Sequence, residues 1–186
     1  MKFSLSISVC LAAVASAASI GSTTESTMRA IMADFSKLGQ QFVKIANDVN
    51  AFPQTGMAGV EDIHNDAAGI HEFFLSINDN LDSLPRPVSN ENVIKVFSTY
   101  KSFTPNIFSY LNGITDKAAD FKALGSASTT ISLDLLGSIA PCVHFGGTVM
   151  AMLPDSIFRQ PAMNDTASTM FNDIDNAKQN AINALA

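Results

Sequence analysis

The sequence has no tryptophan, only two cysteines among its 186 residues, and a low content of charged residues, 15%. Cys10 falls in an apolar N-terminal run that we expect to be removed, which leaves Cys142 alone and excludes an intramolecular disulfide. We interpret Cys142 as a small apolar core residue; an intermolecular bridge or a reactive thiol is the alternative. Stability must therefore come from the packing of the core.

Positive charge is also scarce. Lys and Arg number 11 against 17 Asp and Glu, which gives a formal net charge of −6, and the basic residues are scattered along the chain. DNA, RNA and anionic lipid headgroups are bound by clustered Lys and Arg. The composition therefore excludes nucleic acid as a partner.

Residues 1–17 have the features of a secretory signal peptide. Lys2 supplies positive charge, Ile7 to Val14 form a short apolar run, and Ala15-Ser16-Ala17 places small residues before a cleavage site. The run is too short to cross a bilayer, although an uncleaved N-terminal anchor is the alternative. We predict a mature chain of residues 18–186 that is secreted to the extracellular space or cell wall. Because the C-terminal segment lacks the long apolar tail of a lipid-anchor signal, we expect the mature protein to be released.

The alternation of apolar and polar residues that is typical of half-buried strands is also absent. Apolar residues recur instead at alternating steps of three and four, the spacing of one helix face. This pattern predicts an all-α fold, an antiparallel bundle of about five helices in a single domain, residues 18–186. The clearest stripes are Met28, Ile31, Phe35, Leu38, Phe42, Ile45, Val49 and Phe52; Met57, Val60, Ile63, Ala67, Ile70, Phe74, Ile77, Leu81 and Leu84; Val93, Phe97, Tyr100, Thr104, Ile107, Leu111, Ile114, Ala118 and Phe121; and Met163, Ala167, Met170, Ile174, Ala177 and Ala181.

Helix-breaking and helix-capping residues set the predicted helix ends. Pro53 and Gly56 close the first helix, Ser89 is the expected N-cap of the third, and Gly125 ends the third. The third stripe stays in phase across Pro105. We therefore predict a kink at Pro105 and not two separate helices.

The fourth segment, Ser126 to Pro154, differs from the others because it is apolar on every side. Asp134 is its only charged residue. A helix of this kind is either buried centrally or crosses a membrane. Pro141 and the lack of cationic flanks argue against a stable membrane span, so we predict a central bundle helix.

The candidate metal ligands do not have the spacing of a metal site. His64 and His71 lie seven residues apart, with Glu61, Asp66 and Glu72 nearby. Seven residues correspond to about 10.5 Å of helix rise, too far for both to bind one ion. We predict half-buried, hydrogen-bonded histidines and no metal or other cofactor.

The candidate nucleophiles also lack catalytic context. Ser138 has neither the Gly-x-Ser-x-Gly pattern nor a preceding strand. Cys142 and His144 are two residues apart, so on a helix they point to different sides. We therefore predict that the protein is not an enzyme.

One modification motif is present. Asn164-Asp165-Thr166 is the only N-x-S/T sequon in the chain and lies near the start of the last helix. It predicts N-glycosylation at Asn164, although aspartate in the middle position disfavours it.

Several short stretches resemble the fungal hydrophobic surface-binding protein A family, which includes cell-wall galactomannoproteins. The resemblance rests on the order and spacing of Ile63 to Ala67, Thr104 to Ile107, Lys117 to Phe121, Leu153 to Ile157 and Phe171 to Ala177, and it spans the mature chain. It implies a small secreted helical bundle that adsorbs to hydrophobic surfaces, and some members enclose fatty acids. This chain departs from the family pattern in its more apolar fourth helix and at Arg159 to Ala162.

We therefore expect a secreted binding protein whose partner is a fatty acid, a sterol or a hydrophobic surface. The 13 Phe and 8 Met residues can fill an irregular core or line a deformable pocket. The alternative is a structural or antigenic cell-wall glycoprotein with a solid core, and a lipid lumen would need about 300 Å³ or more of apolar space. The residues expected to line it are Phe35, Phe42, Phe74, Phe97, Tyr100, Phe108, Leu135, Ile139, Met150, Met170 and Ile174.

Overall fold

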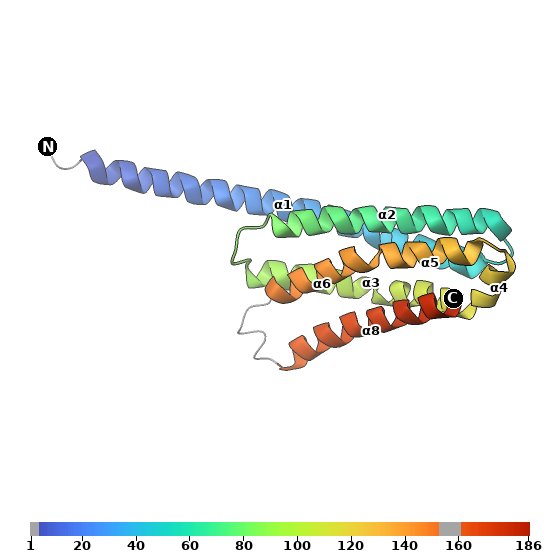
Figure 1. The fold of residues 1–186 in the computed structure, drawn as a ribbon. Coiled ribbons are helices and arrows are strands. Elements are labelled where there is room, and N and C mark those ends of the chain that lie inside the picture. Colours follow the sequence, from blue (N-terminus) through green and yellow to red (C-terminus); the bar gives the residue numbers. More distant parts are fainter. Residues whose placement is uncertain (1–3, 153–160) are drawn as a thin grey trace.

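The computed structural model describes the backbone of residues 4–152 and 161–186, and the side chains of residues 23–152 and 166–186. Those residues form an all-α antiparallel bundle, as predicted (Figure 1). The long helical segments that lie side by side in the bundle, which we call its rods, are α1, α2, α3, α5 continued by α6, and α8. The helices are α1 (Ser4–Ala51), α2 (Gly56–Asp82), α3 (Asn90–Asp116), α4 (Ala118–Ala123), α5 (Ala127–Gly137), α6 (Ile139–Met152) and α8 (Pro161–Leu185).

Helix α1 packs against α2 and α3 through the predicted stripe. From Met28 to Phe52, every residue of that stripe is buried. The part of α1 that precedes Met28 extends beyond the end of α2 (Figure 1). The predicted cleavage motif at residues 15–17 and the sequon residue Asn164 lie outside the described side chains.

A buried polar cluster sets the register between α1 and α2. The buried Asp66 carboxylate accepts hydrogen bonds from Lys44 Nζ at 2.7 Å and from Gln41 Nε2 at 2.9 Å. Burial raises the pKa of Asp66, and the hydrogen bond to that carboxyl raises the pKa of Lys44. A buried carboxylate without these donors would be strongly unfavourable, so the cluster disfavours any sliding of one helix along the other.

Helix α3 begins as predicted and ends earlier than predicted. The Ser89 hydroxyl accepts a hydrogen bond from the Asn92 backbone N–H, and Pro105 lies inside one continuous helix. The expected continuation to Phe121 is wrong, because the chain turns at Lys117 and α4 follows. The turn lets the Phe121 ring stack on the Phe52 ring, with centroids 4.0 Å apart. The spacing of apolar residues along one helix does not predict this tertiary contact.

The prediction of a centrally buried fourth helix is also wrong. The segment divides at Ser138 into α5 and α6 because Pro141 has no N–H for the Gly137 carbonyl and its ring crowds that carbonyl. Together they cover one side of the bundle, where α5 packs against α2 and α8 and α6 packs against α2 and α3. Their outer face leaves Leu133, Leu136 and Val143 62%, 48% and 55% exposed.

The same stretch, Ala127–Met152, is long and apolar enough to cross a membrane. Its mean hydropathy over 18 residues is 1.4, and 39% of that window is buried in the bundle. Core helices of soluble proteins also meet this criterion, so it is weak evidence for a span.

Helix α8 closes the bundle against α3, α4 and α5. Its described stripe residues Ala167, Met170, Ile174, Ala177 and Ala181 are buried as predicted. In the second stripe the exceptions are Met57, which is exposed in the first turn of α2, and Ala67, which is partly buried. Gly56 and Gly125, at the predicted helix ends, have φ values of +59° and +65°, a conformation that favours glycine.

Candidate functional site

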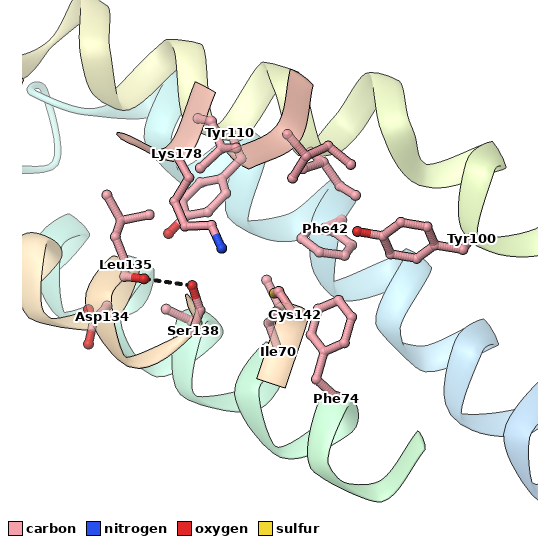
Figure 2. A pocket seen from close by; sticks show the side chains of 14 residues that line it. Phe42, Ile70, Phe74, Tyr100, Tyr110, Asp134, Leu135, Ser138, Cys142 and Lys178 are labelled. Carbon is pink, nitrogen blue, oxygen red and sulfur yellow. Dashed lines mark hydrogen bonds between the residues drawn. The ribbon is translucent and has the colours of Figure 1, made fainter. Parts of the chain in front are cut away.

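A narrow space, which we call the axis cavity, lies where α1, α2, α3, α5, α6 and α8 converge (Figure 2). The space between its wall residues, part of which is open to solvent, totals about 470 Å³, and only about 40 Å³ is wide enough for a water-sized sphere. Within the described residues, this falls short of the volume of about 300 Å³ that a lipid lumen would need, and this part of the core is nearly filled. The wall residues are Phe42, Ala67, Ile70, Phe74, Tyr100, Ile107, Tyr110, Leu111, Asp134, Leu135, Ser138, Cys142, Ile174 and Lys178.

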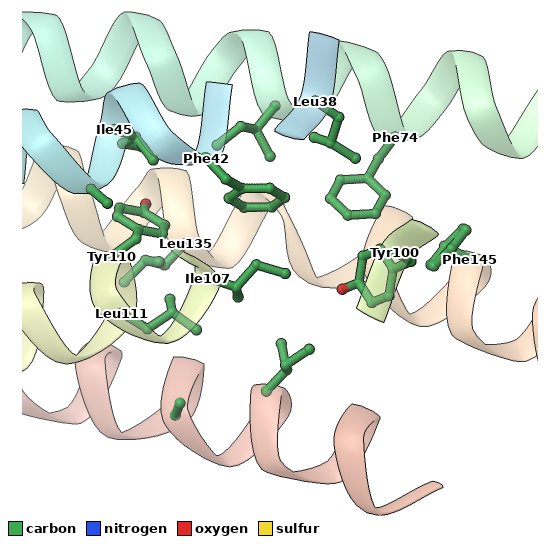
Figure 3. Packing of buried hydrophobic residues seen from close by; sticks show 14 of the residues in the cluster. Leu38, Phe42, Ile45, Phe74, Tyr100, Ile107, Tyr110, Leu111, Leu135 and Phe145 are labelled. Atoms are coloured by element: carbon green, nitrogen blue, oxygen red, sulfur yellow. The ribbon is translucent and has the colours of Figure 1, made fainter. Parts of the chain in front are cut away.

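The structure brings five of the predicted lining residues together at the axis cavity: Phe42, Phe74, Tyr100, Leu135 and Ile174. They come from α1, α2, α3, α5 and α8, so residues far apart in the sequence meet in one place. Figure 3 shows Phe42, Phe74, Tyr100 and Leu135 directed into the interior among Ile107, Tyr110 and Leu111.

The remaining predicted residues lie elsewhere. Phe108 and Met170 border a separate open depression of about 400 Å³ between α3 and α8. Phe35 and Phe97 are buried, and Ile139 and Met150 are partly buried, but none of these four borders the axis cavity.

One end of the axis cavity is closed by an aromatic cluster centred on Phe145, which is fully buried. Its ring centroid lies 4.7 Å from that of Tyr100, 5.7 Å from Phe74, 5.9 Å from Phe35 and 6.1 Å from Phe171. Tilted and edge-to-face pairs at these distances are favourable beyond the area they bury. The sequence places Phe145 in an apolar segment but does not indicate that it is the centre of this cluster.

The polar wall residues do not form a catalytic arrangement. The Ser138 hydroxyl donates to the Leu135 carbonyl at 2.8 Å. Asp134 and His64 form a hydrogen bond of 2.9 Å on the outer side, and His144 Nε2 lies 2.8 Å from Asp82. Cys142 lies on the wall while His144 lies outside, so the two point to different sides as predicted. These histidine pairs attach α5 and α6 to α2.

Burial strongly affects the titratable wall residues. It raises the pKa of Tyr100 and Tyr110 well above the ordinary value for tyrosine, and it raises the pKa of the Cys142 thiol to about 11. The thiol is therefore protonated at neutral pH and a poor nucleophile, because the thiolate is the reactive form. Burial also raises the pKa of Asp134, while the hydrogen bond from His64 lowers it.

The two tyrosines lead to a prediction for alkaline pH. A group whose pKa is raised on folding stabilises the protein below its unfolded pKa, and this stability is lost as pH rises. We expect the free energy of unfolding to fall above pH ~10 by about 1.4 kcal/mol per pH unit for each tyrosine. Tyr100 and Tyr110 are the only tyrosines and there is no tryptophan, so phenolate absorbance reports on them directly.

In such a titration, phenolate absorbance and loss of helical circular dichroism should appear together. Tyr110→Phe should weaken the pH dependence. Phenolate formation near pH 10 in a protein that remains helical would show that the tyrosines are accessible to water.

Another depression, of about 730 Å³, is open to solvent. It lies between α1 and the segment that joins α2 to α3, and its wall contains Met28, Arg29, Arg86 and Lys95. The Arg29 guanidinium forms an exposed ion pair with Glu25. The axis cavity is smaller than this depression, but its wall residues come from every rod of the bundle.

No family model and no curated protein matches the chain. Among solved structures, the fold is similar to ligand binding domain 1 of the Penicillium marneffei MP1 protein, a structure of that domain complexed with arachidonic acids. The TM-score is 0.70, and the match covers 86% of this chain and 99% of that domain at 13% sequence identity. Likeness at this identity supports the fold, an all-α bundle.

Proposed function

We propose that this protein is a non-enzymatic lipid carrier that takes a fatty acid or a similar single-chain lipid into the axis cavity. The observation that carries the proposal is a convergence of apolar side chains from all rods of the bundle on one narrow space. The similar MP1 domain was solved with arachidonic acids, which makes an acyl chain the first candidate to test.

An acyl chain needs more room than the described 40 Å³, so the walls must separate when it enters. The break at Ser138 lies in the wall itself, between Leu135 and Cys142. A divided helix can shift its halves separately, with loss of fewer backbone hydrogen bonds than an unbroken helix. We infer that α5 and α6 move away from α8 to admit the chain, at a free-energy cost that lowers the apparent affinity.

The proposal is tested by native mass spectrometry of delipidated protein mixed with palmitic acid, arachidonic acid or a sterol. We expect one equivalent of fatty acid to bind to the folded protein. The matched variants are Cys142→Leu, which adds apolar volume inside the axis cavity, and Val143→Leu, which adds it on the exposed outer face. Only Cys142→Leu should reduce the fraction of the protein that binds fatty acid.

Surface adsorption is the second candidate, favoured by the exposed side chains of Leu133, Leu136 and Val143 on one face of α5 and α6. Exposed apolar side chains grouped on one element are typical of interaction sites. A protein that takes up no lipid in solution but is retained on an octyl matrix would support adsorption. Failure in both assays would leave the solid-core cell-wall glycoprotein.

We also propose that the protein is secreted and is related to the hydrophobic surface-binding family. The first buried residue described is Met28, so removal of residues 1–17 would leave in place every buried side chain that the structure describes. Glycosylation at Asn164 belongs to the same proposal, and intact-mass measurement of the secreted product tests both.

A further inference from the structure

Lys178 is a buried cation without a hydrogen-bond acceptor. Its side chain is 4% exposed, and among the described residues its Nζ atom has no hydrogen-bond partner. The nearest acidic group is Asp175, at 3.7 Å, and its side chain is 54% exposed to solvent. Lysine side chains normally reach water with their charged end, and a buried amine without partners is strongly unfavourable. The position therefore needs an explanation other than stability.

The Lys178 amine faces the axis cavity. Lys178 is one of its wall residues, and Figure 2 shows its nitrogen directed into the space beside Ser138 and Cys142. Most of the other wall residues are apolar, so the amine is a donor without an acceptor in a mainly apolar space.

Among the described residues, no acceptor lies within hydrogen-bond distance of Lys178 Nζ. Asp134 is the one carboxylate there, and its oxygens point away from Lys178, towards His64 at 2.9 and 3.1 Å. The Ser138 hydroxyl donates to the Leu135 carbonyl, and no hydrogen bond joins its oxygen to Lys178 Nζ. The missing partner is therefore an anionic or strongly accepting group at the head of an apolar molecule.

We propose that Lys178 binds the carboxylate of a fatty acid, so that the site selects free acids over esters, alcohols and sterols. This inference rests on the proposed lipid function and assigns its headgroup site. A hydrogen bond from a cation to a carboxylate is among the strong ones, and it is stronger away from water. The acyl chain would then extend between Phe42, Phe74 and Ile107, where the wall is apolar.

The test compares palmitic acid, methyl palmitate and hexadecanol by competition for a bound fluorescent fatty acid. The wild-type protein should bind the acid about ten- to a hundredfold more tightly than the ester. Lys178→Met keeps the length of the side chain and removes the amine. It should weaken binding of the acid by the same factor, leave the ester unchanged and so abolish the preference. Lys122→Met, an exposed lysine of α4, is the matched control and should behave as the wild type.

Folding of Lys178→Met is verified by its circular dichroism, and the melting temperature of the delipidated variant should equal or exceed that of the wild type. This follows because the substitution removes a buried amine that lacks a hydrogen-bond acceptor. A purely structural lysine would change the melting temperature without changing the ratio of acid to ester affinity.

Three outcomes separate the two proposals. If Lys178→Met binds lipid and still prefers the acid, the headgroup assignment is wrong while the lipid function stands. Equal affinity of the wild-type protein for acid and ester overturns the assignment without any variant. If the wild type binds none of the three compounds, the proposed function itself fails.

Discussion

Replacing Phe145 by alanine is expected to lower the free energy of unfolding by about 3–5 kcal/mol, the range for removing a fully buried aromatic ring. Phe145 is fully buried and its ring contacts those of Phe35, Phe74, Tyr100 and Phe171. The substitution removes the shared partner of four rings on four different helices. Because a domain of this size is stable by only about 5–15 kcal/mol, the variant should unfold at a much lower urea concentration.

Phe73→Ala is the matched control, since Phe73 is only partly buried on α2 beside Phe74. Phe73→Ala should lower the free energy of unfolding by less than half as much as Phe145→Ala does. Equal losses for the two variants, or a loss below about 1 kcal/mol for Phe145→Ala, would mean that the cluster repacks around the missing ring.

The Phe145 variant also bears on lipid uptake. The space left by the ring adjoins the axis cavity, because Phe74 and Tyr100 border both. Less of the wall then has to move to admit an acyl chain. We therefore expect saturating palmitic acid to restore more stability to Phe145→Ala than it adds to the wild type.

Saturating fatty acid is expected to raise the stability of the delipidated wild-type protein by about 2.7 kcal/mol at a hundredfold excess over Kd. For a domain of this size the melting temperature should rise by roughly 5–11 °C. The effect arises because the ligand binds the folded bundle and not the unfolded chain. Differential scanning fluorimetry over a range of fatty acid concentrations measures it, and the rise should continue logarithmically above Kd.

Cys142→Leu should reduce this rise to less than half, because the larger side chain occupies the space among Ile70, Phe74 and Ile174. Val143→Leu, one residue further along α6 and exposed, should leave it unchanged. A melting temperature that does not respond to fatty acids, together with the absence of co-purifying lipid, would refute an internal site.

The helices could be predicted from the sequence because helix formation depends on residues that are close together in the chain. The step of three and four from Met28 to Phe52 places the residues of the first stripe on one face, and all of them are buried. Ser89 precedes a helix start and accepts the expected hydrogen bond, and Gly56 and Gly125 adopt the positive φ that ends a helix. Each of these features depends on the backbone within one or two turns.

The errors came from contacts between distant segments. Nothing in the residues around Lys117 specifies that the chain turns there, because the gain comes from stacking of Phe121 on Phe52, far away in the sequence. The apolar composition from Ser126 onward indicated a central helix, but periodicity does not show which rods surround it. The structure places α5 and α6 at the side, with Leu133 and Val143 exposed.

The candidate site was predictable only in part, for the same reason. Helical spacing identifies Phe42, Phe74, Tyr100, Leu135 and Ile174 as inward-facing, and these five residues meet at the axis cavity. Lys178 follows Ile174 by four residues and so shares its face, but a lysine at that position usually extends to solvent. Its burial is decided by α3 and α5, which pack against α8.

The sequence by itself thus determined the helices, their apolar faces and the antiparallel bundle, because these depend on short-range geometry and on the transfer of apolar area out of water. Tertiary structure alone decided the outer position of α5 and α6, the narrowness of the axis cavity and the burial of Lys178. Those properties depend on how closely faces from several helices approach one another. A volume of about 40 Å³ is what remains after dense packing, and periodicity within one helix carries no information about it.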